Sequence, residues 1–269
     1  MKKIIILGSS GSIGSYLCQK LSSHFKIIAT VRKESDLEMI NDKNNITALK
    51  VDFKKKKDIE QFISKLQDEK DLYGLINCYG VQHPIGKFKN VKFEEWENNI
   101  IINFNNFAFF LHKFLNLKNK VKKIIVFSGG GVTFPRKYFS AYAISKISLY
   151  KYVEILSQEL NKDNIDLNLI APGTIKSKMT KEVIDFGSSL GNEYDNSLKA
   201  FNDGGQSKKK IFDLCQLLLS EKSNGLSGRL FAAQWDNLEK YDMNQLIKDK
   251  NLFTMRRIDE KYFKEKDKS

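Results

Sequence analysis

The stretch KIIILGSSGSIG, residues 3–14, joins an apolar run to a loop with glycines at positions 8, 11 and 14. The run is rich in β-branched residues and has no polar alternation, which is typical of a strand buried on both faces. Glycines between a strand and a helix allow a tight turn and let backbone N–H groups approach a phosphate at the positive end of the helix. The stretch therefore predicts the first strand, loop and helix of a nucleotide-binding α/β fold.

Strand and helix candidates alternate along the chain. Apolar runs predict strands over Lys3–Leu7, Lys26–Val31, Thr47–Val51, Gly74–Asn77, Lys122–Phe127 and Asp166–Ile170, with a last strand inside LSGRLFAA at 226–233. Amphipathic stretches predict helices over Ser12–Ser23, Ser35–Asn41, Lys57–Glu69, Phe93–Leu117, Ser140–Leu160 and Lys208–Ser220. This alternation indicates βαβ units. The expected fold class is α/β, with a doubly wound parallel sheet of the Rossmann type in three α/β/α layers.

No internal repeat or linker interrupts the chain, so residues 1–269 are predicted to form a single domain. Residues 174–206 are polar and glycine-rich with weak helical periodicity, which predicts an irregular lid or loop over the substrate. The charged end KEKDKS, residues 264–269, is predicted to be a frayed tail.

Composition argues against several other classes of protein. The net charge is +13, but the lysines are spread along the whole chain rather than gathered in one patch, so we expect no nucleic-acid partner. Three cysteines without CxxC spacing and three histidines without ligand spacing predict no metal site and a reducing compartment. No run approaches ~20 apolar residues, so we expect a soluble, cytoplasmic protein that does not enter a membrane.

Further motifs follow the glycine loop in order. They are Asp52 in KVDF, Asn77–Gly80 in NCYG, Asn103 in IINFNN, Ser128 in SGGG, Tyr142 and Lys146 in YAISK, and Pro172–Ile175 in PGTI. Over Lys3–Gly228 this set resembles the compact, single-domain short-chain dehydrogenase/reductases. One departure is Ser12, where compact members usually carry glycine. The spacing of Gly8, Gly11 and Gly14 is instead similar to that of the extended members that modify nucleotide sugars.

The resemblance implies a nicotinamide dinucleotide cofactor. It assigns cofactor binding to Gly8, Ser10, Gly11, Ser12, Ile13, Gly14, Arg32, Lys33, Asp52, Phe53, Asn77, Gly80, Tyr142, Lys146, Pro172, Gly173, Thr174 and Ile175. Arg32 and Lys33 directly follow the second predicted strand, where an NAD enzyme tends to present a carboxylate to the free 2′-hydroxyl. Guanidinium groups suit phosphate oxygens, which predicts that NADP(H) is preferred over NAD(H). The open alternative is that Arg32 is one more cation of a basic chain.

A tyrosine four residues before a lysine occurs three times, at Tyr16/Lys20, Tyr142/Lys146 and Tyr262/Lys266. Side chains at this spacing share one face of a helix. Only the second pair follows a serine that ends a predicted strand, so we expect the other two pairs to have no catalytic part.

The resemblance also implies catalytic roles. Tyr142 would be the acid/base, and Lys146 would hold the nicotinamide ribose and lower the pKa of the phenol. Ser128 would hydrogen-bond the substrate oxygen, and Asn103 would position a water that relays protons. Ser128 lies one residue further from Tyr142 than in most compact members, so Thr133 and Ser140 are alternatives for that hydroxyl.

The leading interpretation is an oxidoreductase that transfers a hydride between NADP(H) and a small carbonyl or secondary alcohol. A nucleotide-sugar epimerase or dehydratase and a non-catalytic NADP(H)-sensing regulator are the alternatives. The stretches around SGGG and YAISK look like a branch associated with bacterial surface-polysaccharide synthesis, which suggests a sugar or nucleotide-sugar substrate. The resemblance further implies a homodimer or homotetramer that pairs through the helices predicted at 93–117 and 140–160.

Overall fold

The computed structural model describes residues 1–41, 45–117 and 120–258. Within these residues, seven strands form one sheet in the order β3-β2-β1-β4-β5-β6-β7, and every neighbouring pair is parallel. The strands are β1 (Lys3–Leu7), β2 (Lys26–Val31), β3 (Ile46–Lys50), β4 (Leu72–Asn77), β5 (Lys123–Phe127), β6 (Asp166–Ala171) and β7 (Leu230–Ala232). The predicted fold class is confirmed.

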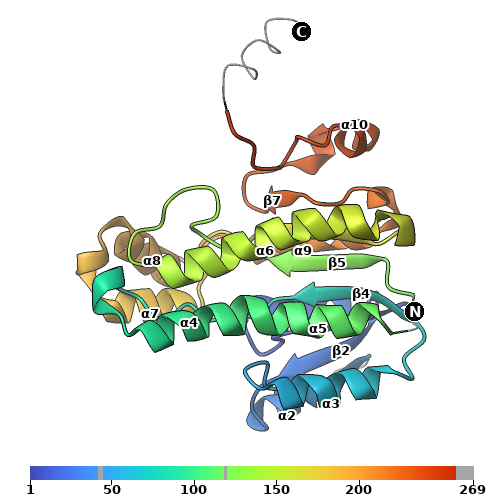
Figure 1. Cartoon of the computed structure of the whole chain (residues 1–269), viewed down its shortest axis with the longest axis horizontal. Coiled ribbons are helices and arrows are strands. Elements are labelled where there is room, and N and C mark those ends of the chain that lie inside the picture. The colour runs from blue at the N-terminus through green and yellow to red at the C-terminus, as the bar shows by residue number, and fades with distance from the viewer. Residues whose placement is uncertain (42–44, 118–119, 259–269) are drawn as a thin grey trace, which may run out of the picture.

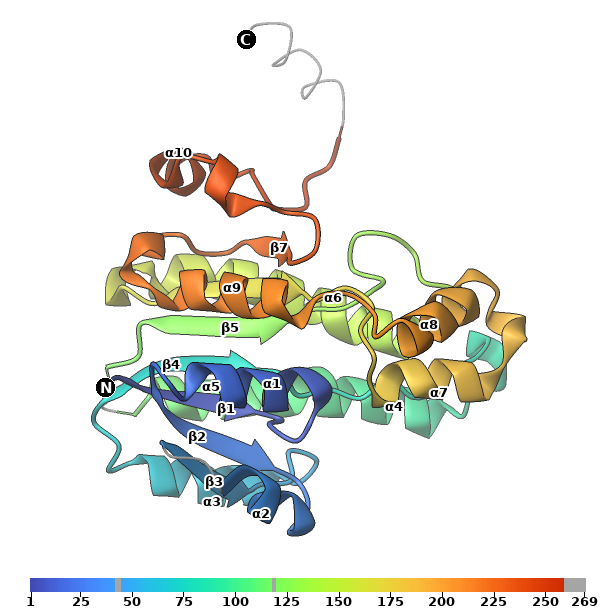
Figure 2. The same ribbon diagram turned by 180° about the vertical axis from the view of Figure 1, so that it is seen from behind.

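Helices cover both faces of the sheet. They are α1 (Ser12–Leu21), α2 (Ser35–Asn41), α3 (Lys56–Leu66), α4 (Phe93–Ile100), α5 (Asn106–Leu115), α6 (Ser140–Glu159), α7 (Lys178–Phe186), α8 (Asn192–Asn202), α9 (Lys208–Leu219) and α10 (Met243–Lys248). Helices α3, α5 and α6 lie on the face seen in Figure 1, and α1 and α9 lie on the opposite face seen in Figure 2.

Side chains that alternate along each strand contribute to two hydrophobic cores, one on each face of the sheet. Ile4 and Ile6 of β1 pack with α1 and α9, whereas Ile5 and Leu7 pack with α3, α5 and α6. Successive side chains of a strand point to opposite faces, so a strand between two helical layers must be apolar throughout. This requirement explains the unbroken isoleucine run that predicted β1.

The predicted helix at 93–117 is interrupted. Residues Ile101–Asn105 form a π-helical turn between α4 and α5, and the backbone N–H of Asn106 bonds to the carbonyl of Ile101, five residues back. The amphipathic pattern continues across this turn, so the sequence showed no break. A single extra residue in one turn is often found at functional sites.

The segment 174–206 was expected to be irregular, and this expectation was wrong. It contains α7 and α8, which pack against each other. Ser177 and Thr180 form a reciprocal cap that starts α7: the Ser177 hydroxyl accepts from the Thr180 N–H, and Thr180 Oγ1 accepts from the Ser177 N–H. The serine-threonine cap is a local start signal that the sequence carried.

The other predicted elements agree with the structure within a few residues at their ends, and α10 was not predicted. The tail 264–269 and the Tyr262/Lys266 pair lie outside the described residues. Of the helices that the structure describes, none is long and apolar enough to cross a membrane.

The strand order reverses direction between β1 and β4. In a doubly wound sheet, ligands bind at the carboxyl ends of the strands beside this switch point. Helices α7 and α8 lie beyond those ends, where the β5 arrow points in Figures 1 and 2. The loops that follow β1, β4, β5 and β6 therefore meet at one edge of the sheet.

Candidate active site

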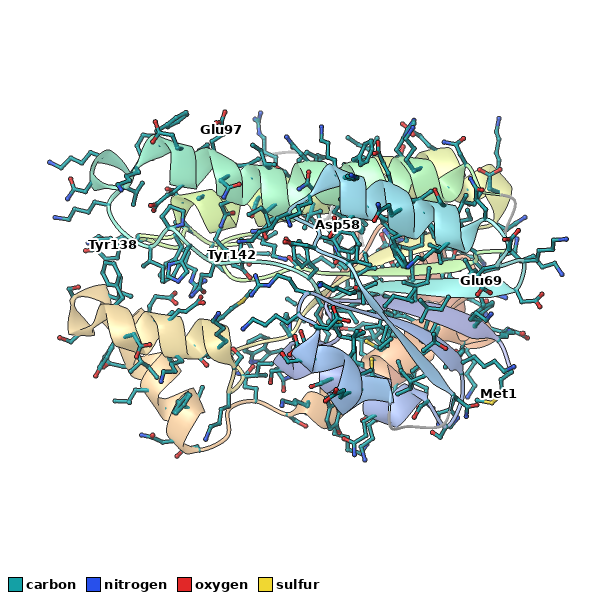
Figure 3. The ribbon with its side chains drawn as sticks, turned by 90° about the horizontal axis from the view of Figure 1, so that it is seen from below. Met1, Asp58, Glu69, Glu97, Tyr138 and Tyr142 are labelled. Carbon is teal, nitrogen blue, oxygen red and sulfur yellow. The ribbon has the colours of Figure 1, made fainter. Side chains whose placement is uncertain are left out.

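A cleft of about 1200 Å³ opens at this edge. It is lined by the glycine loop, by the segments that follow β4, β5 and β6, and by α7 and α8. Figure 3 shows Tyr142 and Tyr138 on the side of the molecule that carries α7 and α8, whereas Met1 and Glu69 lie at the other end. The cleft is large enough to hold a dinucleotide together with a small substrate.

The glycine loop turns tightly at the start of α1. Gly8 has φ +76°, and its N–H donates to Thr30 Oγ1 at 3.1 Å. A Cβ added to Gly14 would lie 2.4 Å from the Gly8 carbonyl oxygen, so helix and loop pack with no room for a side chain. The Ser12 hydroxyl donates to the Lys176 carbonyl at 2.8 Å, which links the loop to the segment after β6. Ser12, which stands where compact short-chain dehydrogenase/reductases usually carry glycine, therefore has a hydrogen-bond partner.

The adenosine end of the cleft is expected beside β2 and β3. Arg32, Asp36, Asp52 and Phe53 line the cleft there, and Lys33 is not among the lining residues. The sequence did not point to Tyr79, whose ring packs on Phe53 at 5.4 Å between centroids. Among the described residues the buried Tyr79 hydroxyl has no hydrogen-bond partner, and burial raises its pKa.

Tyr142 and Ser128 line the cleft, and the buried Lys146 lies behind them, outside the lining. The Lys146 ammonium lies 5.7 Å from the centre of the Tyr142 ring, and its Nζ donates to the Phe127 carbonyl at 2.9 Å. Ser128 follows Phe127 directly, and its buried hydroxyl has no partner in the described part of the chain. An added Cβ on Gly129 would lie 2.1 Å from the Tyr142 hydroxyl, so the phenol rests against the backbone beside Ser128.

The two alternatives to Ser128 differ from it in exposure or bonding, although Thr133 also lines the cleft. Thr133 is exposed, and the Ser140 hydroxyl accepts from Trp96 Nε1 at 3.1 Å. The structure thus places Ser128, rather than either alternative, beside the Tyr142 phenol.

Burial shifts the pKa values of both Tyr142 and Lys146. It raises the pKa of the Tyr142 phenol, and the nearby Arg136 guanidinium opposes this only in part. It lowers the pKa of the Lys146 ammonium to about 8. The sequence-based expectation was a Tyr142 pKa lowered by Lys146 together with the charge of an oxidised nicotinamide. In the protein by itself, desolvation of the phenolate outweighs the attraction of the Arg136 guanidinium.

The π-helical turn directs Asn103 into the protein. Its Oδ1 accepts from the Val81 N–H at 2.8 Å, and its Nδ2 donates to the Val81 carbonyl at 2.8 Å and to Ser145 Oγ at 3.0 Å. A Cβ added to Gly80 would lie 3.4 Å from Lys146 Nζ and 3.5 Å from Asn103 Oδ1. Asn103 therefore holds the loop after β4 against the helix that carries Lys146. Asn99, which the sequence did not single out, supports the same loop by donating to the His83 carbonyl at 2.6 Å.

The remaining expected cofactor residues also border the cleft or support it. Asn77 Oδ1 accepts from the Tyr79 N–H at 3.1 Å and so shapes the turn after β4. Gly173 has φ +79°, and a Cβ there would lie 1.7 Å from Gln206 Oε1. Besides Arg32, Asp52, Phe53 and Tyr142, the positions of the sequence-based assignment that line the cleft are Gly8, Ser10, Gly11, Ser12, Ile13, Gly14, Gly80, Pro172, Gly173, Thr174 and Ile175.

The sequence did not point to Arg136. This residue lies in the loop between β5 and α6, and its Nε and Nη2 donate to Glu193 Oε2 of α8 at 2.9 and 2.7 Å. Its Nη1 donates to Gln82 Oε1 at 3.2 Å. Residues 82, 136 and 193 are far apart in the chain, so no local pattern could have joined them.

No group of His, Cys, Asp or Glu side chains that could hold a metal ion occurs among residues 1–41, 45–117 and 120–258.

Comparison with known proteins identifies the family. Residues 2–186 match the family model described as short chain dehydrogenase, which is more than half of the chain. The chain belongs to the short-chain dehydrogenase family. This short-chain dehydrogenase is an NAD(P)-dependent oxidoreductase that acts on carbonyl or alcohol groups.

Curated relatives of this short-chain dehydrogenase are about a quarter identical to it over the residues that align. The 3-oxoacyl-[acyl-carrier-protein] reductase FabG of Buchnera aphidicola is 27% identical over 192 residues, which cover 68% of this chain and 77% of the relative. The 5-keto-D-gluconate 5-reductase of Escherichia coli K12 is 27% identical over 199 residues, covering 68% and 76%. Among solved structures, a point variant of the actinorhodin polyketide ketoreductase with NADPH superposes with a TM-score of 0.76 at 14% identity, covering 86% of this chain and 95% of that one.

The residues of this short-chain dehydrogenase fit the cofactor of its family. The tight packing of Gly14 against Gly8 leaves the backbone of the loop open to the cleft, as a pyrophosphate requires. The Ser128 and Tyr79 hydroxyls are buried, without partners among the residues that the structure describes, at two places along the same cleft. Buried polar groups are normally hydrogen-bonded, so both hydroxyls favour a polar ligand here.

Proposed function

We propose that this short-chain dehydrogenase reduces the carbonyl group of a small substrate with NADPH, using Tyr142 as proton donor and Ser128 as the group that orients the carbonyl oxygen. The observation that carries the proposal is the buried Ser128 hydroxyl, which has no partner within the described ranges and follows β5 directly beside the backbone that the Tyr142 phenol contacts. A carbonyl oxygen that accepted from Ser128 would satisfy this hydroxyl and lie next to the phenol.

The raised pKa of Tyr142 suits this direction of reaction. A phenol with a raised pKa stays protonated at neutral pH and can give its proton to the oxygen that gains charge. Lys146, whose pKa falls to about 8, is mostly protonated at neutral pH and stands within the same helix turn. Its ammonium would stabilise the phenolate left behind after proton transfer.

A bound nicotinamide cofactor supplies the hydride. The glycine loop from Gly8 to Gly14 would hold the pyrophosphate, and Asp52, Phe53 and Tyr79 would enclose the adenine. Lys146 would also bind the nicotinamide ribose, and Pro172–Ile175 would border the nicotinamide. Arg32 supports a preference for NADP(H), because it lines the cleft where the phosphate of the adenosine ribose is expected.

Relatives support a ketone as the reacting group. The two curated relatives named above are a 3-oxoacyl reductase and a 5-keto-D-gluconate reductase, and both names describe reduction of a ketone. Neither name points to surface polysaccharide, so that association does not enter the proposal. An epimerase or dehydratase finds no support in the site.

Helices α7 and α8 would form the lid of the cleft, in place of the irregular loop expected from the sequence. We also propose pairing into a dimer or tetramer through α4, α5 and α6. The partly buried Phe104 and Tyr152, from the π-helical turn and α6, pack edge to face with ring centres 5.6 Å apart. Light scattering at micromolar concentration tests the assembly, and a monomer mass would contradict it.

The test of function uses NADPH oxidation with 2,3-butanedione, a reactive diketone. Tyr142→Phe removes the proton donor and keeps the ring, so turnover should fall at least ~10²-fold, the scale of general acid catalysis, while NADPH affinity changes little. The matched control is Tyr16→Phe, because the Lys20 ammonium lies 5.9 Å from the Tyr16 ring in nearly the same geometry. Full turnover by Tyr142→Phe overturns the assignment. Tight NADPH binding by a wild type that reduces no carbonyl would favour the regulator instead.

A further inference from the structure

Arg136 is a confined cation inside the candidate substrate part of the cleft. Its side chain is 13% exposed and lines the cleft, and its guanidinium carbon lies 5.7 Å from the centre of the Tyr142 ring. The proposed reaction gives this guanidinium no part, because neither hydride transfer nor proton donation needs it. A cation held this close to the reacting group can contact a second group of the substrate.

The guanidinium is positioned by its own loop. It lies over the ring of Phe139, with its carbon 3.7 Å from the ring centre. Its aliphatic stem passes Gly130 and Gly131, where an added Cβ would come within 3.2 Å of it in both cases. An arginine stacked on an aromatic ring keeps its donors aimed in one direction. Arg136 would therefore stay in place if its carboxylate partner moved.

The carboxylate partner comes from another element that lines the cleft, α8. Glu193 is the second residue of α8, its side chain is 36% exposed, and it accepts two of the Arg136 N–H groups. The connection from α7 to α8 runs through Gly187 and Gly191 at φ +109° and +58°, and within the described residues a Cβ at either would meet nothing within 4 Å. Glu193 is therefore the member of the ion pair that another anion can displace.

We infer that Arg136 binds a carboxylate or phosphate group that the substrate carries a few bonds from its reacting carbonyl, and that Glu193 holds this place until the substrate displaces it. A guanidinium fork matches both anions through paired N–H donors. The inference rests on the proposed function and narrows its substrate class to oxo acids and phosphorylated ketones. The competing interpretation is a latch that only holds the lid, which would treat charged and neutral substrates alike.

The test compares substrates that differ by one charged group. Acetoacetate and acetoacetamide form the carboxylate pair, and dihydroxyacetone phosphate and dihydroxyacetone form the phosphate pair. For each pair the readout is the ratio of kcat/KM for the charged member to that for the neutral one. Arg136→Gln should lower this ratio at least about tenfold in one of the pairs, the size of a lost charge-assisted contact, and Arg136→Lys should restore part of it. Glu193→Gln should raise the same ratio, because the competing carboxylate is gone.

Lys137→Gln is the matched control. Lys137 carries the same charge on the same loop, is exposed and is not among the residues that line the cleft, so its removal should leave the ratio as in wild type. Unchanged ratios in Arg136→Gln for both pairs, or a fall in Glu193→Gln, overturn the inference.

A second readout does not depend on turnover. Acetoacetate or inorganic phosphate should raise the Tm of the NADPH-saturated wild type and not that of Arg136→Gln, with circular dichroism to show that the variant is folded. No such rise in wild type, together with unchanged ratios, also counts against the site. A wild type that shows this rise but reduces neither the neutral ketones nor 2,3-butanedione would refute the proposed function and leave the anion site standing.

Discussion

The hydroxyl of Tyr142 occupies the space beside Gly129 where a side chain would otherwise begin, since a Cβ there would lie 2.1 Å from it. Alanine at position 129 must therefore displace the phenol or the loop. We expect Gly129→Ala to lower turnover at least ~10²-fold, as loss of a positioned acid does, while the protein stays folded. Gly130→Ala is the comparison, because its Cβ would approach only the Arg136 side chain, at 3.2 Å, and not the Tyr142 phenol. Equal activities of the two variants would show that Tyr142 does not depend on this contact.

Ser128→Ala should separate activity from stability. The buried Ser128 hydroxyl has no partner among the described residues, so its removal breaks no native hydrogen bond and relieves an unsatisfied group. We expect the free energy of unfolding to stay unchanged or to rise, while kcat/KM falls at least about tenfold. Urea unfolding and steady-state kinetics measure the two quantities, and Thr133→Ala serves as control. A stability loss in Ser128→Ala would mean that the hydroxyl has a structural partner instead.

Lys146 should give a distinct pH dependence of stability. Its pKa falls from 10.5 to about 8 in the folded protein, so the unfolded chain binds more protons between these values and stability rises with pH across that window. The cost of burying the charged ammonium, of order 3 kcal/mol, is present below pH ~8 and relieved toward pH ~10. Wild type should therefore gain stability relative to Lys146→Met over this range, without nucleotide. The exposed Lys20→Met should follow wild type, and parallel curves for all three proteins would contradict the shift.

Arg32 and Lys33 make a matched pair for cofactor preference. Arg32 lines the cleft and Lys33 does not. Wild type should bind NADPH more tightly than NADH. Arg32→Ala should reduce this difference in binding free energy by ~1–3 kcal/mol, the range for a hydrogen bond to a charged group, and Lys33→Ala should reduce it less. Fluorescence titration with both cofactors measures the difference. Equal affinities of wild type for the two cofactors would leave Arg32 as one more surface cation.

The sequence predicted the sheet well because its strands are local and apolar throughout. β1 lies where its isoleucine run placed it, and the glycine loop and the YAISK pair meet at the same edge of the sheet. The order of the motifs also predicted that Ser128 lies near Tyr142, although the spacing of the two residues kept Thr133 and Ser140 as alternatives. These features depend on residues close in sequence or on a topology that βαβ units impose.

Contacts between distant segments could not be predicted. Arg136 meets Glu193 only because α8 forms and packs over the cleft, and the sequence of that segment has weak periodicity. The rise that burial causes in the pKa of Tyr142 could not be predicted either, because motif reasoning counts nearby charges and burial can be known only from the fold.

The extra residue in the turn Ile101–Asn105 changes the phase of one continuous helical rod. Each residue advances an α-helix by about 100°, so α5 is rotated relative to the path that α4 alone would set. With this offset α4 can place Asn99 toward the loop after β4 while α5 turns Phe107, Phe110 and Phe114 to the sheet. Deletion of one residue in this turn would therefore rotate every side chain of α5 about the helix axis. Single substitutions keep the number of residues and so would not reveal the importance of the turn. In comparing relatives, the position of a gap here carries more information than the identity of any aligned residue.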